Sequence, residues 1–95
     1  MDKLEVEEKT KFINNNYNLI CITFISLDES INYSVICQSN DAFQMLENKL
    51  YKKYPEYSKI ENGFLLNGNK INRFQSLQEN KIGDNDVIVF HSSLL

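Results

Sequence analysis

The sequence predicts a small α+β domain with the element order ββαββ, in which one helix packs across a mixed sheet. Three observations support this class. Two alternating apolar runs, Leu19–Leu27 and Ile31–Cys37, are separated by a short polar turn, which is typical of a β-hairpin. An amphipathic stretch follows over residues 39–54, and Gly63–Phe90 then contains two turn clusters and a β-branched run. A hairpin, a crossing helix and two returning strands are therefore expected.

The hairpin strands alternate in character. We expect one face of the first strand to enter the core (Ile20, Ile22, Phe24) and the other to point outward (Cys21, Thr23, Ile25). In the second strand, the corresponding inward set is Ile31, Tyr33 and Val35, and the outward set is Asn32, Ser34 and Ile36.

The helix is predicted from an apolar stripe with spacings of three and four residues, namely Phe43, Leu46, Leu50 and Tyr54. Ser39 or Asn40 is expected as the N-cap, with Asp41 in the first turn, where a negative charge suits the helix dipole. The opposite, solvent-facing side is assigned to Glu47 with Tyr51 and to Asn48 with Lys52. Pro55 ends the helix because the residue before a proline avoids helical backbone angles.

The second half begins with the short strand Phe64-Leu65-Leu66. Asn67-Gly68 predicts a type I′ turn, since both central residues of that turn need positive φ, and Lys70-Ile71 returns as a brief strand. Leu77 and Ile82 are single apolar anchors in an irregular segment. Gly83-Asp84-Asn85-Asp86 forms a turn before the last strand, Val87–Phe90, which we expect to pair in parallel with the first strand.

The segment FLLNGNKI, followed in order by Leu77, Ile82, GDND and VIVF, resembles the ubiquitin-like proteins. The resemblance covers residues Ile20 to His91, and the GDND–VIVF spacing with Asn72 is slightly closer to the SUMO branch. It implies a ubiquitin-like β-grasp fold over residues 19–95. The acidic, Asn-rich residues 1–18 are expected to form a flexible N-terminal extension, with docking of Val6, Phe12 and Ile13 as the alternative.

Composition restricts the function classes. The net charge of −3 and the scattered basic residues give no basic stripe, so nucleic acid is not an expected partner. The chain has no apolar run of membrane-spanning length, so a membrane is not expected either, and the cytoplasm or nucleus is the expected location. Cys21 and Cys37 are interpreted as buried thiols, with a disulfide between neighbouring strands as the alternative.

No set of residues predicts catalysis. His91 is the one histidine, and a Cys–His pair with Cys21 or Cys37 would need a deep pocket that small domains of this type do not offer. Asp84 and Asp86 resemble the beginning of a calcium loop, but the required glycine position and terminal glutamate are missing, so they are interpreted as turn residues. We therefore expect no enzyme, no cofactor and no metal site.

The resemblance implies a partner-binding surface on the outer face of the sheet. The ubiquitin pattern places it at Leu27, Leu65 and His91, and Ile25 and Val89 point to the same face. The SUMO pattern implies instead a peptide groove between the second strand and the helix, with the residues Tyr33, Val35, Ile36, Lys49 and Lys53. That strand carries no basic residue of its own, unlike the usual groove for acidic peptides.

The printed sequence ends HSSLL, without the Gly-Gly that ubiquitin-like modifiers need for conjugation. The expected function is a non-catalytic ubiquitin-like adaptor that recruits proteins, either ubiquitin-receptor-like partners or complex subunits. The alternatives are a ubiquitin- or SUMO-type modifier whose Gly-Gly tail lies outside this chain, and a structural subunit of a larger complex. A Ras-binding type of adaptor would need a basic strand edge or an acidic cluster, and GDND is a weak acidic cluster.

Overall fold

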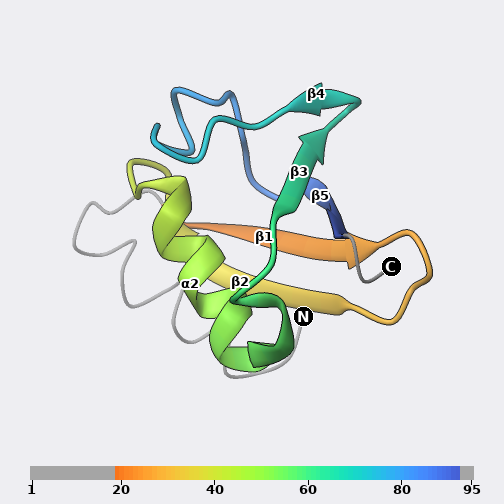
Figure 1. Cartoon of the computed structure of the whole chain (residues 1–95). Coiled ribbons are helices and arrows are strands. Elements are labelled where there is room, and N and C mark those ends of the chain that lie inside the picture. The colour runs from red at the N-terminus through yellow and green to blue at the C-terminus, as the bar shows by residue number, and fades with distance from the viewer. Residues whose placement is uncertain (1–18, 93–95) are drawn as a thin grey trace, which may run out of the picture.

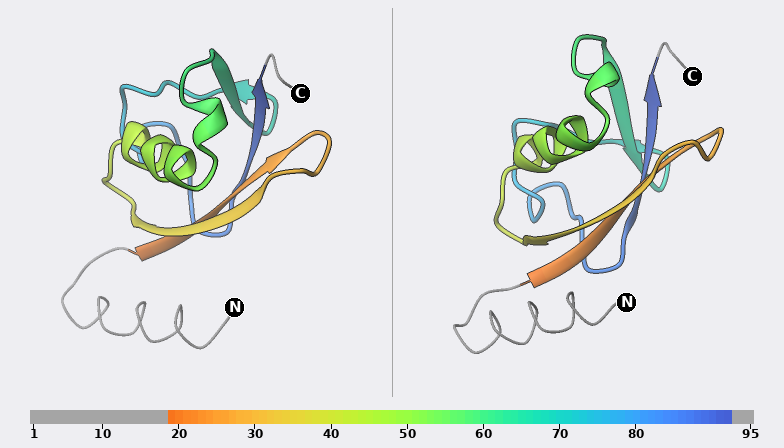
Figure 2. Two further views of the ribbon diagram at one scale, coloured as in Figure 1. Left: turned by 60° about the horizontal axis from the view of Figure 1, so that its bottom comes forward. Right: turned by 90° about the horizontal axis from the view of Figure 1, so that it is seen from below.

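The computed structural model describes residues 19–92, and the expected extension over residues 1–18 lies outside them. A five-stranded mixed sheet has the order β2-β1-β5-β3-β4, and helix α2 packs across one face (Figures 1 and 2). The predicted α+β class, with a β-grasp arrangement of one helix across a mixed sheet, is confirmed. The elements are β1 (Leu19–Ser26), β2 (Asn32–Gln38), α2 (Phe43–Lys53), a 3₁₀ helix η1 (Pro55–Tyr57), β3 (Asn62–Leu66), β4 (Asn69–Lys70) and β5 (Val87–Ser92).

The first hairpin forms as its alternation predicts. β1 and β2 are antiparallel, with Ile22 opposite Val35, and the inward side chains of both strands are buried or packed against the core. The intervening turn is held by Asp28, whose carboxylate accepts hydrogen bonds from the Ser26 hydroxyl at 2.7 Å and from the Ser30 backbone N–H at 3.1 Å. This turn ends β1 at Ser26 and carries Leu27 outward.

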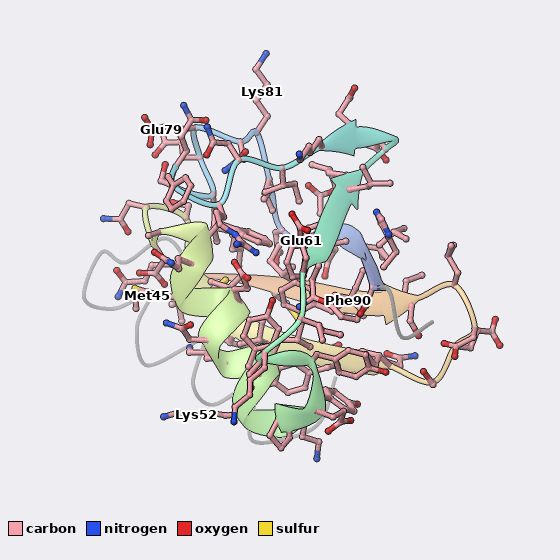
Figure 3. All side chains as sticks on the ribbon, in the orientation of Figure 1. Met45, Lys52, Glu61, Glu79, Lys81 and Phe90 are labelled. Atoms are coloured by element: carbon pink, nitrogen blue, oxygen red, sulfur yellow. The ribbon has the colours of Figure 1, made fainter. Side chains whose placement is uncertain are left out.

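β1 and β5 are parallel neighbours in the middle of the sheet, as expected, with Phe24 beside Ile88. Four phenylalanines form the centre of the core between sheet and helix, and the Phe43 and Phe64 rings meet edge to face with centroids 5.1 Å apart. The others in this cluster are Phe24 and Phe90. Figure 3 shows Phe90 within the molecule, whereas Lys52 and Lys81 extend away from it.

The expected start of the helix is wrong. Ala42, not Ser39 or Asn40, occupies the N-cap position, and no side chain caps the helix. Asp41 precedes the first turn, and its carboxylate accepts the Gln38 N–H at 2.8 Å. The N–H of Phe43 donates to the Gln75 carbonyl at 3.0 Å, so a loop distant in sequence supplies the partner that a cap would have provided.

The back half follows the predicted turns. Asn67 and Gly68 have φ values of 51° and 81°, as a type I′ turn requires. In the second turn, the Asp84 carboxylate accepts the Cys21 N–H at 2.7 Å, and the Asp86 carboxylate accepts the Gly83 N–H at 2.7 Å. Asp86 therefore closes the turn, and Asp84 ties the turn to β1.

The two cysteines lie on opposite faces of the sheet because Ile20, not Cys21, is opposite Cys37. No disulfide joins them, and Cys21 is only half-buried, so its expected burial is wrong. No helix formed by residues 19–92 has both the length and the apolar character needed to cross a membrane.

Candidate protein-interaction surfaces

The face of the sheet opposite α2 carries a row of apolar side chains across its three central strands. Ile25 of β1 is beside Val89 of β5, and Val89 is opposite Leu65 of β3. Cross-strand neighbours share one face, and all three side chains are half-buried. We call Ile25, Val89 and Leu65 the outer row.

The outer row is extended toward the β1–β2 turn. Leu27 is 78% exposed, and it lies in the turn directly after Ser26, which pairs with Phe90 of β5. Val87, which sequence reasoning missed, is exposed two residues before Val89. Its position in the alternation of β5 was the signal that could have found it. The strand registers thus place Ile25, Leu65, Val89 and His91 on one face of the sheet, and Leu27 lies in the turn that follows β1.

His91 does not approach either cysteine in a catalytic arrangement. Cys37 lies on the inner face, and Cys21 is three outer-face positions away along the β1–β5 pair, a distance of about 20 Å at about 3.3 Å per residue. Among the described residues, no three His, Cys, Asp or Glu side chains are grouped to hold a metal ion.

The alternative groove beside β2 is only partly assembled. Tyr33 packs edge to face against Tyr54, with centroids 6.4 Å apart, and Val35 is buried beneath the helix. Ile36 points to the other face because it alternates with both of them. Lys49 is half-buried and Lys53 is exposed on α2. A peptide beside β2 would therefore not contact all five of these residues in one groove.

A buried polar network joins the helix to the segment after β4, and it corrects the assignment of Glu47 to the solvent side. Glu47 is 4% exposed, and one carboxylate oxygen accepts the Tyr51 hydroxyl at 2.7 Å and pairs with the Arg73 guanidinium. Asn62 of β3 donates to the same Tyr51 hydroxyl at 2.8 Å. We call Glu47, Tyr51, Asn62 and Arg73 the polar network.

The polar network also changes the ionisation of its tyrosine. Burial, together with the hydrogen bond that Tyr51 donates to Glu47, raises the pKa of Tyr51 to about 12. A sequence signal for the network existed, because Arg73 is the one arginine beside nine lysines, and arginine suits buried ion pairs. Tyr51 also follows Glu47 by one helical turn.

Similarity to solved structures agrees with this architecture. A de novo design based on ubiquitin superimposes with a TM-score of 0.68 at 13% identity, over 80% of this chain and 90% of the design. The NMR structure of a ubiquitin-like domain from an Arabidopsis thaliana protein gives 0.67 at 17% identity, over 79% and 78% of the two chains. No protein-family model matches the sequence, and no curated protein matches it either. The chain has a ubiquitin-like fold.

Proposed function

We propose that this chain is a non-catalytic ubiquitin-like interaction module, an adaptor that binds other proteins through the outer face of its sheet. The observation that carries the proposal is the outer row, in which Ile25, Val89 and Leu65 are adjacent across three strands. The adaptor binds its partners in the cytoplasm or nucleus.

The physical support is the apolar character of this face. Within residues 19–92, α2 and η1 both lie on the other side of the sheet (Figure 2), and the side chains of the outer row remain partly exposed. Burying apolar surface contributes about 25 cal/mol per Å², and a few central apolar anchors usually dominate an interface. Leu27 and Val87 extend the row toward both ends. A partner helix with its own apolar stripe fits such a flat surface.

A test uses the full chain and a ubiquitin-binding helical module as the probe. We expect Leu65→Asp to abolish binding, because it places a charge in the middle of the row. Gln44→Asp is a matched control, since it adds the same charge to an exposed position on α2. Amide spectra of both variants establish that they remain folded. Unchanged binding by a folded Leu65→Asp variant would reject the surface.

A second candidate is a structural subunit whose outer face is permanently buried. The observation that favours it is that Leu27, 78% exposed, adds to the apolar side chains of the outer row, because contiguous exposed apolar patches commonly mark protein–protein interfaces. Sedimentation of the chain alone distinguishes the two. A mass that rises with concentration and falls in Leu27→Asp supports the subunit, and a constant monomer mass supports the adaptor.

A further inference from the structure

Among residues 19–92, no strand pairs with the first half of β3 on the side away from β5, and this leaves an open backbone edge. β4 is short and pairs with Leu65 and Leu66 alone among the residues of β3. Directly after β4, the Ile71 N–H donates to the Phe64 carbonyl at 3.0 Å. The backbone groups of Phe64 therefore point toward the edge of β3 that faces away from β5. Because the direction of these groups alternates along a strand, the N–H and C=O of Asn62 point to the same edge, beyond the reach of β4.

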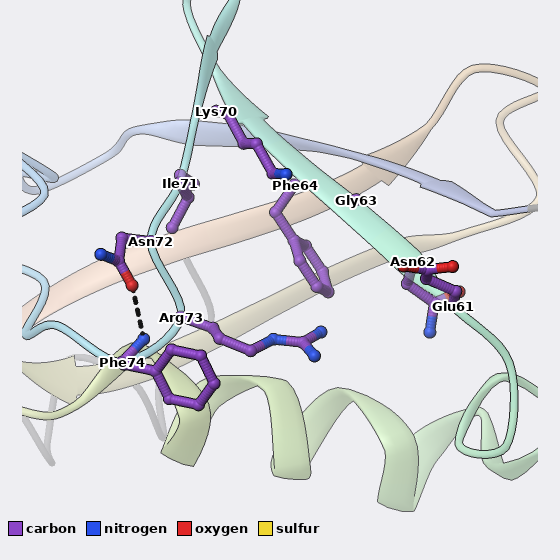
Figure 4. A pocket seen from close by; sticks show the side chains of 9 residues that line it. All are labelled: Glu61, Asn62, Gly63, Phe64, Lys70, Ile71, Asn72, Arg73 and Phe74. Carbon is purple, nitrogen blue, oxygen red and sulfur yellow. Dashed lines mark hydrogen bonds between the residues drawn. The ribbon is translucent and has the colours of Figure 1, made fainter.

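Two hollows flank this edge, one on each face of the sheet. Their shared lining is Glu61, Asn62, Gly63, Phe64 and Lys70. The helix-side hollow has a volume of about 450 Å³ and lies between β3 and residues 71–74 (Figure 4). The outer hollow has a volume of about 580 Å³ and is completed by Leu65, His91 and Ser92.

The far wall of the helix-side hollow is fixed in place. Asn72 accepts the Phe74 N–H at 3.0 Å, as Figure 4 shows, and the Asn72 N–H donates to Asn80 at 2.9 Å. Arg73 is tied to Glu47 of α2. Phe74 nevertheless leaves 79% of its surface exposed at the rim of the hollow, where it is available to another apolar side chain.

We propose that this edge binds an extended segment of a partner protein, which adds antiparallel to β3 and continues the direction of β4. The residue opposite Asn62 would exchange two backbone hydrogen bonds with it. Successive side chains of an added strand point to opposite faces, so consecutive residues would enter the two hollows in turn.

The residues that line the two hollows define the sequence of the partner segment that fits this edge. The residue opposite Asn62 faces the helix side and is aromatic or large and aliphatic, because it meets Phe74 and Ile71. Its two neighbours face outward. The preceding one lies toward Lys70 and is acidic, whereas the following one lies beside Glu61 and is basic. The matching segment is therefore acidic–apolar–basic.

This site differs from the outer row, although the outer hollow includes Leu65 and His91. It depends on Phe74 and Lys70, which belong to the segment after the Asn67-Gly68 turn. The two proposals can fail separately, because Leu27→Asp alters the outer face and Phe74→Ala alters the helix-side hollow.

The probe is a capped seven-residue peptide with threonine and valine flanks and the centre aspartate–phenylalanine–lysine, titrated into the labelled full chain. We expect amide shifts at residues 61–64 and 70–74. Methylating the backbone nitrogen of the central phenylalanine should weaken binding at least about tenfold, since that N–H faces Asn62. Methylating the aspartate nitrogen is the control, because that N–H points away from β3.

Two protein variants complete the test. Phe74→Ala should weaken binding about tenfold without unfolding, as its ring is exposed. Lys70→Glu should reverse the preference at the first position, so that a peptide with lysine in place of the aspartate, and with its second lysine kept beside Glu61, binds better. Three results would each overturn the proposal. The first is equal binding of the two methylated peptides, and the second is a set of amide shifts concentrated at residues 33–37. The third is that the unmethylated aspartate–phenylalanine–lysine peptide does not bind at concentrations up to about 1 mM.

Discussion

The imidazole of His91 lies over Gly63, its antiparallel partner on the outer face of the sheet. A Cβ built on Gly63 would stand 2.6 Å from the His91 Nε2 atom, closer than side-chain atoms approach one another. Because Gly63 has no side chain, the histidine ring can lie between β5 and the open edge of β3.

A double-mutant cycle tests this dependence. Gly63→Ala gains strand propensity but displaces the His91 ring, so we expect little net change in the free energy of unfolding. In a His91→Ala background the clash is absent, and Gly63→Ala should then stabilise the fold by about 0.5 kcal/mol or more. Urea unfolding of the four proteins gives the coupling energy, and purely additive effects would contradict the contact.

The polar network predicts that removing the charge of Arg73 lowers the free energy of unfolding more than removing the charge of an exposed lysine. Arg73→Ala leaves the buried Glu47 carboxylate without its cation, and we expect a loss of about 2–3 kcal/mol of unfolding free energy. Arg73→Lys should recover part of it. Lys52→Ala, an exposed basic residue on the same helix, should change stability by about 0.5 kcal/mol or less. Similar losses for Arg73→Ala and Lys52→Ala in urea unfolding would show that Glu47 does not depend on Arg73.

Tyr51 makes stability depend on alkaline pH. Its folded pKa of about 12 exceeds the ordinary value of 10.0, so the folded state retains the phenolic proton more strongly than the unfolded state does. This contribution is complete below pH 10 and is lost as the pH rises toward 12. We expect the melting temperature of the wild type to fall more steeply than that of Tyr51→Phe between about pH 9.5 and 11. Parallel curves would contradict the role of the buried hydroxyl.

The two thiols should differ in reactivity. Burial raises the pKa of Cys37 to about 12, whereas Cys21 lies half-buried on the outer face. Since the thiolate is the reactive form, an alkylating reagent at neutral pH should modify Cys21 first and Cys37 only on unfolding. Mass spectrometry of the native wild type and of Cys21→Ser separates the sites. Rapid labelling of native Cys21→Ser would contradict the burial of Cys37.

The elements that could be predicted from sequence are those with local signals. The strand alternation of β1 and β2, the type I′ turn at Asn67-Gly68 and the helical stripe all depend on neighbours in the chain. The helix start was predicted wrongly because its first N–H bonds to Gln75, which a local cap pattern cannot reveal. Glu47 was placed in solvent for a similar reason: its burial depends on Arg73, a residue 26 positions later.

On the surface, too, the features with a local sequence signal could be predicted, and those that depend on distant residues could not. The alternation of β1 and β5 predicts that Ile25 and Val89 point outward, and their side-by-side register follows from the parallel pairing. The hollows beside β3 were not predicted, because they arise where the two-residue β4 ends and the chain turns toward α2. The polar network joins this segment, through Arg73, to α2 and to Asn62 of β3, which are three separate parts of the chain.

The most direct measurement is an amide chemical-shift titration of the labelled full chain with a ubiquitin-binding helical module and, separately, a SUMO-interacting peptide. We expect the helical module to shift Leu27, Leu65 and Val89, and Leu65→Asp to remove those shifts. Shifts along Tyr33–Cys37 with the peptide would place recognition beside β2 instead. If the helical module moves none of the outer-row resonances, binding through the outer face of the sheet is wrong.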